Sequence, residues 1–142
     1  MKEQDFTKRL TIVVRSDLES WQVANAIAHI SAYIGNKLEG DFDTGTYFTS
    51  VDNVTFPRNS QYPIIIKAAS DTNVLKQAFD IVRAEGLLHI AFMREMIESS
   101  DDAEIERILK DKKCDDIELL GFGVFGENEK VKTLTKQFGL WK

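Results

Sequence analysis

Residues 15–29 bring together the side chains of this sequence that are best suited to bind a ligand. Arg15 and Asp17 lie in a turn between an apolar run and a helical pattern, where a guanidinium and a carboxylate beside exposed helix N–H groups can bind and orient an anion. Trp21 and Asn25 follow at a spacing of four, which puts an indole and an amide on one helix face. This segment predicts a ligand site. Its candidate residues are Arg15, Asp17, Trp21, Gln22, Asn25 and, from a later segment, Glu95.

Each of these residues also has a structural interpretation. Arg15 and Asp17 can form a surface ion pair while Asp17 caps the helix, contributions of about 1 kcal/mol each. For this pair the sequence alone favours the structural interpretation. Trp21 can pack under a loop whose backbone Asn25 holds, so for these two residues both interpretations stay open. His29 lies one turn further along the same face, far enough from the helix start that we expect a half-exposed side chain.

The sequence carries no motif for a metal site, a phosphate loop or an activated nucleophile. Two histidines and one cysteine make no cluster of metal ligands. His89 lies within an apolar run, which is typical of a satisfied structural histidine. The glycines of GFGVFGE (Gly121, Gly123 and Gly126) are not followed by Lys-Ser/Thr, so they indicate close helix packing or a bulge. We therefore predict no cofactor and no metal.

Composition and charge describe a single domain, residues 1–142, that can bury a core. The chain has 142 residues, 43% of them hydrophobic. Its net charge of −5 argues against non-specific nucleic-acid binding, which needs a concentrated Lys/Arg surface. The single Cys114 permits no internal disulfide and fits a reducing compartment. Since no apolar run has the length of a signal peptide or a membrane span, we expect a cytoplasmic protein with no membrane partner.

Hydrophobic periodicity predicts alternating strands and helices. The predicted strands are 10–14, 64–69, 88–92 and 117–125, with a β-hairpin of 46–50 against 54–56. The first predicted helix begins at a Ser16 or Asp17 cap and ends at Gly35-Asn36; the others cover 72–85 after a Ser70 cap, 94–112 with a break near 99–101, and 129–136. This order predicts a three-layer α/β/α domain with a mixed, mostly parallel sheet of about four core strands.

The opening VVRSDL of residues 13–18, followed by an Ala-rich helix that reaches Ala28-His29, resembles the opening of peptidyl-tRNA hydrolase II. That family reads V-V-R-x-D-L, then a Gly/Lys-rich turn, then A-A-Q-x-x-H. The later segments follow in the same order, down to LLGFGVFG at residues 119–126 and a closing helix. The resemblance covers most of the chain and implies a peptidyl-tRNA hydrolase II-like fold.

The sequence departs from the hydrolase family at the positions of that family's chemistry. The resemblance places Gln22 at the family's catalytic lysine, Ser20 at its other lysine and Ala26 at its glutamine. Residues 93–97 replace its Asp-Ala-Gly-x-Thr loop. The positions that carry over are Arg15, Asp17 and His29. Loss of the lysine and of the Asp/Thr loop implies that the chain does not hydrolyse peptidyl-tRNA.

A closer resemblance is to the domain-of-unknown-function family numbered two thousand, which shares that fold. The shared pattern is V-V-R-x-D-L-x-x-W-Q-x-x-N. Here its residues are Val13, Val14, Arg15, Asp17, Leu18, Trp21, Gln22 and Asn25. On this pattern the chain is identified as a member of that family, which implies a fold and a candidate site but names no activity.

The preferred hypothesis is a small protein that binds a small-molecule ligand or a partner at the first strand–helix junction. One alternative is a hydrolase with repurposed residues, in which Asp17 or Glu95 acts as the base and His29 assists. The other is a non-catalytic homodimeric module that associates through a small-residue helix face or a sheet edge. That helix face is Ala24, Ala28 and Ala32.

Overall fold

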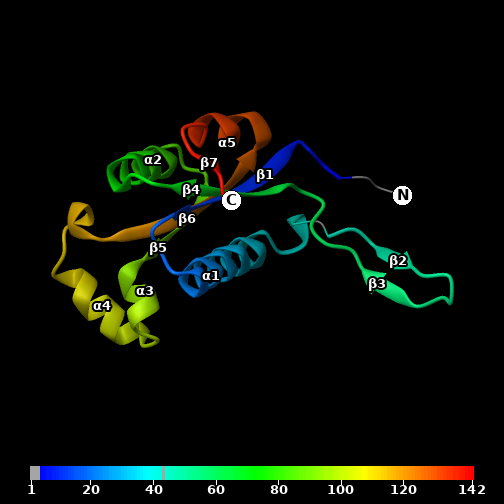
Figure 1. The fold of residues 1–142 in the computed structure, drawn as a ribbon, viewed down its shortest axis with the longest axis horizontal. Coiled ribbons are helices and arrows are strands. Elements are labelled where there is room, and N and C mark those ends of the chain that lie inside the picture. Colours follow the sequence, from blue (N-terminus) through cyan, green and yellow to red (C-terminus); the bar gives the residue numbers. More distant parts are fainter. Residues whose placement is uncertain (1–3, 43) are drawn as a thin grey trace.

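The computed structural model describes residues 4–42 and 44–142, and its centre is a five-stranded sheet (Figure 1). The strands lie in the order β5-β6-β1-β4-β7. Their bounds are Lys8–Arg15 for β1, Ile64–Ala69 for β4, Leu88–Met93 for β5, Leu119–Glu127 for β6 and Gly139–Leu140 for β7. The four long strands are those that the apolar runs predict. β7 is too short to produce a pattern.

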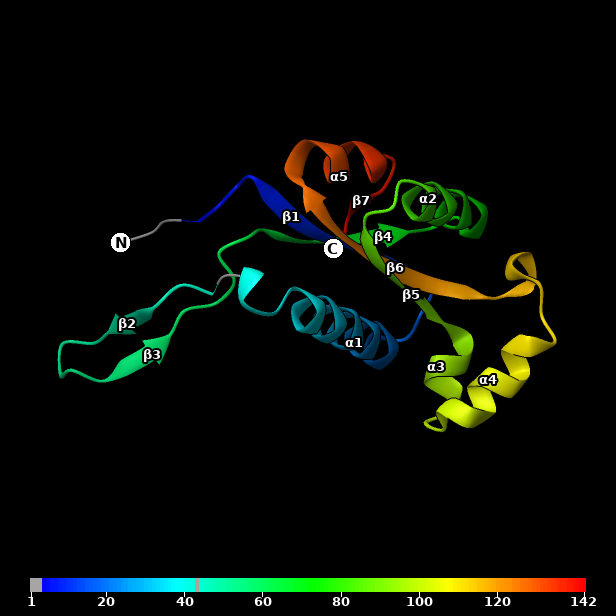
Figure 2. The ribbon, with the colours of Figure 1, turned by 180° about the vertical axis from the view of Figure 1, so that it is seen from behind.

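The sheet is mixed, as predicted. β1 and β4 are parallel, β6 is antiparallel to both β1 and β5, and β7 is antiparallel to β4. Three strands (β1, β4 and β5) therefore point the same way. Most neighbouring pairs are nevertheless antiparallel, whereas the sequence predicts a mostly parallel sheet. The helices between β5 and β6, α3 (Arg94–Glu98) and α4 (Asp102–Lys110), lie beyond the end of the sheet (Figures 1 and 2). Because a parallel return needs a crossover over a sheet face, β6 returns antiparallel.

Helices cover both faces of the sheet, which confirms the three-layer α/β/α architecture. α1 (Ser20–Leu38) lies on one face, and α2 (Thr72–Ala84) and α5 (Asn128–Leu134) lie on the other (Figure 2). Successive residues of β1 enter opposite cores, Ile12 on the α1 side and Val13 on the α2 side. The rigid sheet between two cores fixes the positions of the side chains at its edge.

α1 differs from its prediction at both ends. Its N-cap is Glu19, in a capping box with Gln22, because the carboxylate of Asp17 accepts hydrogen bonds from a guanidinium instead. At its other end the helix passes through Gly35 and ends at Leu38. The extra turn packs Leu38 against the α1-side core, and this burial outweighs the low helix propensity of glycine.

The later helices follow their patterns closely. α2 buries the four predicted core residues: Leu75, Ala78, Phe79 and Val82. Its N-cap is Asp71 rather than Ser70, because the Asp71 carboxylate accepts two backbone N–H bonds of the first turn. The predicted break near 99–101 separates α3 from α4, and Asp101 caps α4. The α2 segment ends before Gly86, whose φ is 70°.

Several residues noted in the sequence have structural roles. A Cβ on Gly123 would approach Cγ2 of Ile30 to 2.3 Å, so this glycine allows close packing of α1 on β6. The Nδ1 atom of His89 lies 2.8 Å from the carbonyl oxygen of Leu87. The helix line Ala24, Ala28 and Ala32 is exposed. This line faces away from the sheet because α1 packs on the sheet through another stripe, which includes Val23, Ile30 and Ile34.

Candidate functional site

The carboxyl edge of the sheet carries four charged side chains, Arg15, Asp17, Arg94 and Glu118, which we call the edge network. Arg15 donates to both carboxylate oxygens of Asp17, at 2.9 and 2.6 Å, and through Nη1 to Glu118 Oε1 at 2.9 Å. Arg94 donates to both carboxylate oxygens of Glu118, at 3.0 and 3.1 Å. Topology assembles the network, because β1 and β5 end at the edge where β6, between them, begins.

Pairing keeps all four groups of the edge network charged. The hydrogen bonds from Arg15 lower the pKa of Asp17, and those from Arg94 and then Arg15 lower the pKa of Glu118. The same bonds raise the pKa of both guanidinium groups. Two cations and two carboxylates cancel, so the network offers a ligand no surplus charge. This geometry favours the structural interpretation of the Arg15–Asp17 pair.

Trp21 and Gln22 both contact the cap of α1. Trp21 Nε1 donates to Glu19 Oε2 at 2.8 Å, and its side chain is exposed. The Glu19 backbone N–H donates to Gln22 Oε1 at 3.1 Å. Gln22 is therefore engaged by the helix start, while Trp21 presents an indole surface to solvent.

Asn25 and His29 line a groove of about 820 Å³ between α1, β5 and the helices α3 and α4. The ring of His29 stacks on that of Phe92, with centroids 6.0 Å apart and planes 27° apart. His29 is exposed, in line with the half-exposed side chain expected from its distance to the helix start. Arg15 does not line this groove; it lines a separate groove at the carboxyl edge of the sheet.

Glu95 is the most buried of the predicted site residues, with 5% of its surface exposed. Lys112 Nζ donates to its Oε1 at 2.8 Å, and among the described residues Oε2 has no hydrogen-bond partner. Burial acts to raise the pKa of Glu95, but the hydrogen bond and charge of Lys112, together with a backbone hydrogen bond, outweigh it and the pKa is lowered. The pair ties the segment after α4 to α3.

The predicted site residues thus occupy separate places. Arg15 and Asp17 lie in the edge network, and Trp21 and Gln22 lie at the start of α1. Asn25 lines the groove beside α3 and α4, and Glu95 is paired with a lysine. The acid–base set of the hydrolase hypothesis is divided as well. Asp17 pairs with a guanidinium, Glu95 with an ammonium and His29 with a phenyl ring. In the described part of the chain no hydrogen bond joins any two of these three side chains.

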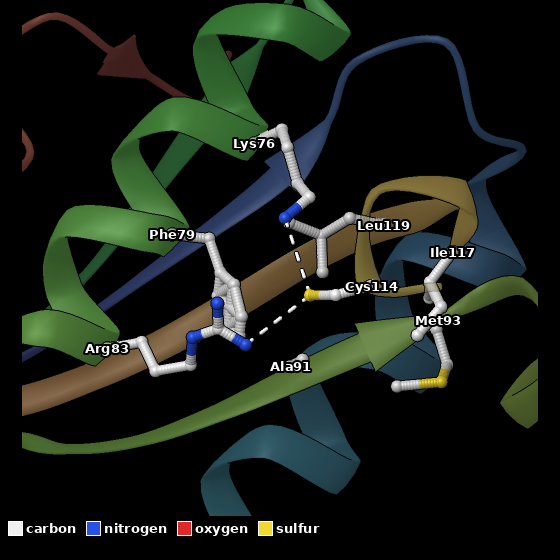
Figure 3. Close-up of a pocket in the computed structure, with 8 residues that line it drawn as sticks. All are labelled: Lys76, Phe79, Arg83, Ala91, Met93, Cys114, Ile117 and Leu119. Atoms are coloured by element: carbon white, nitrogen blue, oxygen red, sulfur yellow. Dashed lines mark hydrogen bonds between the residues drawn. The ribbon is translucent and has the colours of Figure 1, made fainter. Parts of the chain in front are cut away.

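A cavity that the sequence analysis did not predict lies between α2, β5 and the segment before β6 (Figure 3). Its volume is about 150 Å³. The lining combines apolar walls with two cations and a thiol. The lining residues are Lys76, Phe79, Arg83, Ala91, Met93, Cys114, Ile117 and Leu119.

Cys114, in the short 3₁₀ helix η2 (Cys114–Asp116), lies between two cations of α2 in Figure 3. Its Sγ is 3.3 Å from Arg83 Nη1 and 3.6 Å from Lys76 Nζ. Asp80 is shared by both cations, at 2.7 Å from Lys76 Nζ and 3.7 Å from Arg83 Nη2. The hydrogen bond to Asp80 raises the pKa of Lys76. We call Lys76, Asp80, Arg83 and Cys114 the cavity cluster.

The cavity adjoins a groove of about 410 Å³ at the carboxyl edge of the sheet. The two spaces share Lys76, Ile117 and Leu119, and the groove reaches Arg15 and the first turn of α2. Three carboxylates also line the groove. One of them, Asp115, approaches Lys76 to 3.5 Å, but its side chain is 90% exposed and water screens this pair. Even without the cavity, this groove has the volume of a small-molecule site, which is roughly 300–1,000 Å³.

One sequence signal could have indicated the helical side of the cavity. Lys76, Phe79 and Arg83 follow at spacings of three and four, which places two cations and a ring on one helix face. The opposite side has no such signal. Cys114 lies 31 positions from Arg83 in the chain, and only the path of the chain after α4 brings the two together.

Two further findings apply to the described residues, 4–42 and 44–142. No group of three or more His, Cys, Asp and Glu side chains there could hold a metal ion. No helix in the same ranges has the length and apolar character of a membrane span.

Comparison with known proteins shows a family and a fold. The sequence model of the family described as Protein of unknown function (DUF2000) matches residues 8–142. The structure is similar to that of Atu0240, a protein of unknown function from Agrobacterium tumefaciens strain C58, with a TM-score of 0.83 and 19% sequence identity. The similarity covers 97% of this chain and 100% of that chain. At this identity it shows a shared fold alone. Among curated proteins, none matches the sequence.

Proposed function

This chain belongs to the DUF2000 family of proteins of unknown function, and we propose that it binds a small molecule at the carboxyl edge of its sheet, beside the first strand–helix junction. The observation that carries this proposal is the cavity, an apolar space with two cations in its lining. An apolar pocket with a few convergent polar groups is the default place for a ligand. The adjoining groove gives the ligand access and further room.

The lining favours a small carboxylate with an apolar body. Phe79 and Met93 contribute apolar walls, and an apolar cavity of about 150 Å³ holds a body the size of benzene. Lys76 and Arg83 share the carboxylate of Asp80, and the further pair of Lys76 with Asp115 is long and screened by water, which leaves positive charge for the carboxylate of a ligand. Burial of the body contributes affinity, and charge-assisted hydrogen bonds to the two cations orient the ligand.

Of the residues predicted from the sequence, Arg15 lines the adjoining groove, where its guanidinium is already paired with Asp17 and Glu118 and therefore shapes the groove wall without binding the ligand's charge. Asp17 acts through Arg15, whose guanidinium it holds with two hydrogen bonds. The other predicted residues do not line the cavity or this groove. They are Trp21, Gln22, Asn25 and Glu95.

We also propose that the fold is peptidyl-tRNA hydrolase II-like, that the hydrolase chemistry is absent and that the protein is cytoplasmic. The VVRSDL motif lies where β1 ends before α1, which supports the resemblance. Gln22, at the family's lysine, is engaged in the helix cap, and Ala26, at its glutamine, is fully buried. α3 takes the place of the family's loop.

We expect the purified chain to release no peptide from peptidyl-tRNA. Release that Asp17→Asn abolishes would contradict this part of the proposal.

Ligand binding is tested by thermal shift and titration calorimetry with phenylacetate and hexanoate, each beside its uncharged amide. We expect the carboxylates to stabilise the protein more than the amides do. Lys76→Met and Arg83→Gln should each weaken binding roughly tenfold or more, because each removes a hydrogen bond to a charged group. Lys130→Met is the matched control, since it removes a lysine of α5 that is also ion-paired but lies outside the cavity.

Cys114 gives an independent measure of occupancy. Its thiol lines the cavity, so a bound carboxylate should slow its alkylation by a maleimide. The proposal is wrong if neither carboxylate changes the melting temperature or the alkylation rate at millimolar concentration. It is also wrong if the amides bind as tightly as the carboxylates, because the two cations would then play no part.

A further inference from the structure

The hairpin of β2 (Tyr47–Thr49) and β3 (Thr55–Pro57) projects from the body of the protein in both views of the ribbon (Figures 1 and 2). We call residues 47–57 the arm. Its two strands form a sheet of their own and pack mainly on each other. Because a lone two-stranded hairpin is marginally stable in water, such an arm gains stability from a surface that covers it.

The arm exposes large apolar side chains on both faces and at its tip. Phe48 and Phe56 are direct cross-strand partners, 55% and 53% exposed. Val54 lies two residues before Phe56 and therefore on the same face. Tyr47 is 61% exposed on the other face, and Val51 in the turn is fully exposed. Several large exposed apolar side chains on one short hairpin are typical of an interaction site.

The body of the same chain offers a groove that matches the arm in chemistry. This groove, of about 460 Å³, lies between the first half of α1 and β4, and Ile27, Ile66 and Trp141 are among its apolar lining residues. Ile64, 41% exposed, lies on the same face of β4 as Ile66 and extends it. Ala24, small and exposed, lines it from α1. The arm follows the opposite end of α1 and points away from the body, so the arm and the groove of one copy do not meet (Figure 1).

We infer that this chain forms a twofold dimer in which the arm of each copy lies in the α1–β4 groove of the other. The two phenylalanines, which share one face of the arm, leave about 200 Å² uncovered if each ring is taken as roughly 200 Å². Two exchanged arms, with the surfaces that they cover, then bury about 850 Å² through these rings. Val54 on the same face and the arm backbone add to this area and bring it to about 1,200 Å², the size at which specific interfaces begin. A twofold axis covers both arms and fills both grooves at once, which is why a second copy is the occupant.

The test is the mass of the full chain in solution, measured by light scattering after size-exclusion chromatography. We expect twice the chain mass of 16.2 kDa at micromolar concentrations. The double variant Phe48→Ser with Phe56→Ser should be a monomer with an unchanged circular dichroism spectrum, since both side chains are exposed. Ala24→Arg, which places a long cation in the groove, should also be a monomer. Ile81→Ser is the matched control, because Ile81 is 52% exposed on α2 and should leave the dimer intact.

Mixing the arm variant with Ala24→Arg sharpens the test. The mixture contains one intact arm and one intact groove per pair, so a heterodimer should form with reduced affinity. A monomeric wild-type chain at all accessible concentrations would overturn the inference. So would a dimer that survives loss of both arm phenylalanines, or one that Ala24→Arg leaves unchanged. This inference is independent of the proposed ligand site, because none of the substituted residues lines the cavity.

Discussion

The edge network and the cavity cluster lie on neighbouring parts of the same sheet edge, yet they pair their charges differently. In the edge network each carboxylate accepts two or more hydrogen bonds at 3.1 Å or less, and the Arg15 side chain is only 12% exposed. In the cavity cluster one carboxylate, Asp80, is shared by two cations, and its contact with Arg83 is a long 3.7 Å.

This difference separates a structural role from a binding role. A cluster whose charges cancel within it stabilises the fold and holds β1, β5 and β6 together. A cluster with incompletely paired cations beside an apolar cavity keeps donors for another molecule. The residue types that first suggest chemistry, Arg15 and Asp17, belong to the first kind.

The largest expected effect is on stability. Arg15→Ala should lower the free energy of unfolding by about 1–2 kcal/mol, because it removes hydrogen bonds to two carboxylates and leaves a nearly buried space. Arg83→Ala should cost less than about 0.5 kcal/mol, since that side chain is half exposed and its ion pair is long. Urea denaturation of both variants measures the difference. Equal costs would remove the distinction between the two clusters.

The pH dependence should have opposite signs at the two clusters. The pKa values of Asp17 and Glu118 are lowered in the fold, so their pairing stabilises above the unfolded pKa values of about 4 and is lost as the pH falls through the folded values. The stability advantage of wild type over Arg15→Ala should therefore shrink below about pH 4. The pKa of Lys76 is raised, so its contribution is lost at alkaline pH, above about 10.4. Denaturation curves across pH measure both; an Arg15→Ala difference that is constant into acid would contradict the pairing.

The features of the fold that depend on neighbouring residues could be predicted from the sequence, whereas those that depend on distant residues could not. The bounds of β4 and the four buried residues of α2 were predicted because apolar runs and helical spacing are local signals. The N-caps of α1 and α2 were wrong by one to three residues, because several nearby side chains can cap and tertiary contacts decide which one does. The family pattern around residues 13–25 was also found from local motifs.

The site was harder to predict than the elements. Arg15 was identified, but its partner Glu118 lies 103 positions away, directly before β6, and the antiparallel pairing of β6 with β1 brings it close. The cavity depends on η2 lying against α2, which no local pattern encodes. Chemistry-bearing residues are visible in a sequence, whereas the completeness of their pairing is a property of the fold.

A smaller effect is expected at the start of α1, where Trp21 and Gln22 were both predicted as site residues. Gln22→Ala should lower the free energy of unfolding by about 1 kcal/mol, since it removes half of the capping box. Trp21→Ala should cost about 0.5 kcal/mol or less, because the indole is largely exposed and its one hydrogen bond is at the surface. Thermal or urea unfolding of both variants checks the order. A larger cost for Trp21→Ala would mean that the indole packs against a surface in solution.

The smallest expected effect is that of Cys114→Ser, which tests whether the thiol of the cavity contributes to stability or binding beside the two cations. Cys114→Ser should change the free energy of unfolding by less than about 0.5 kcal/mol, because the side chain is exposed and a hydroxyl can accept from Arg83 and Lys76 as the sulfur does. Binding of phenylacetate should be unchanged in this variant, since the proposed recognition comes from the two cations and the apolar walls. Calorimetry on wild type and Cys114→Ser makes the comparison. If the serine variant alone loses binding, the thiol itself contacts or reacts with the ligand, and the cavity cluster would then be a cysteine site rather than a carboxylate site.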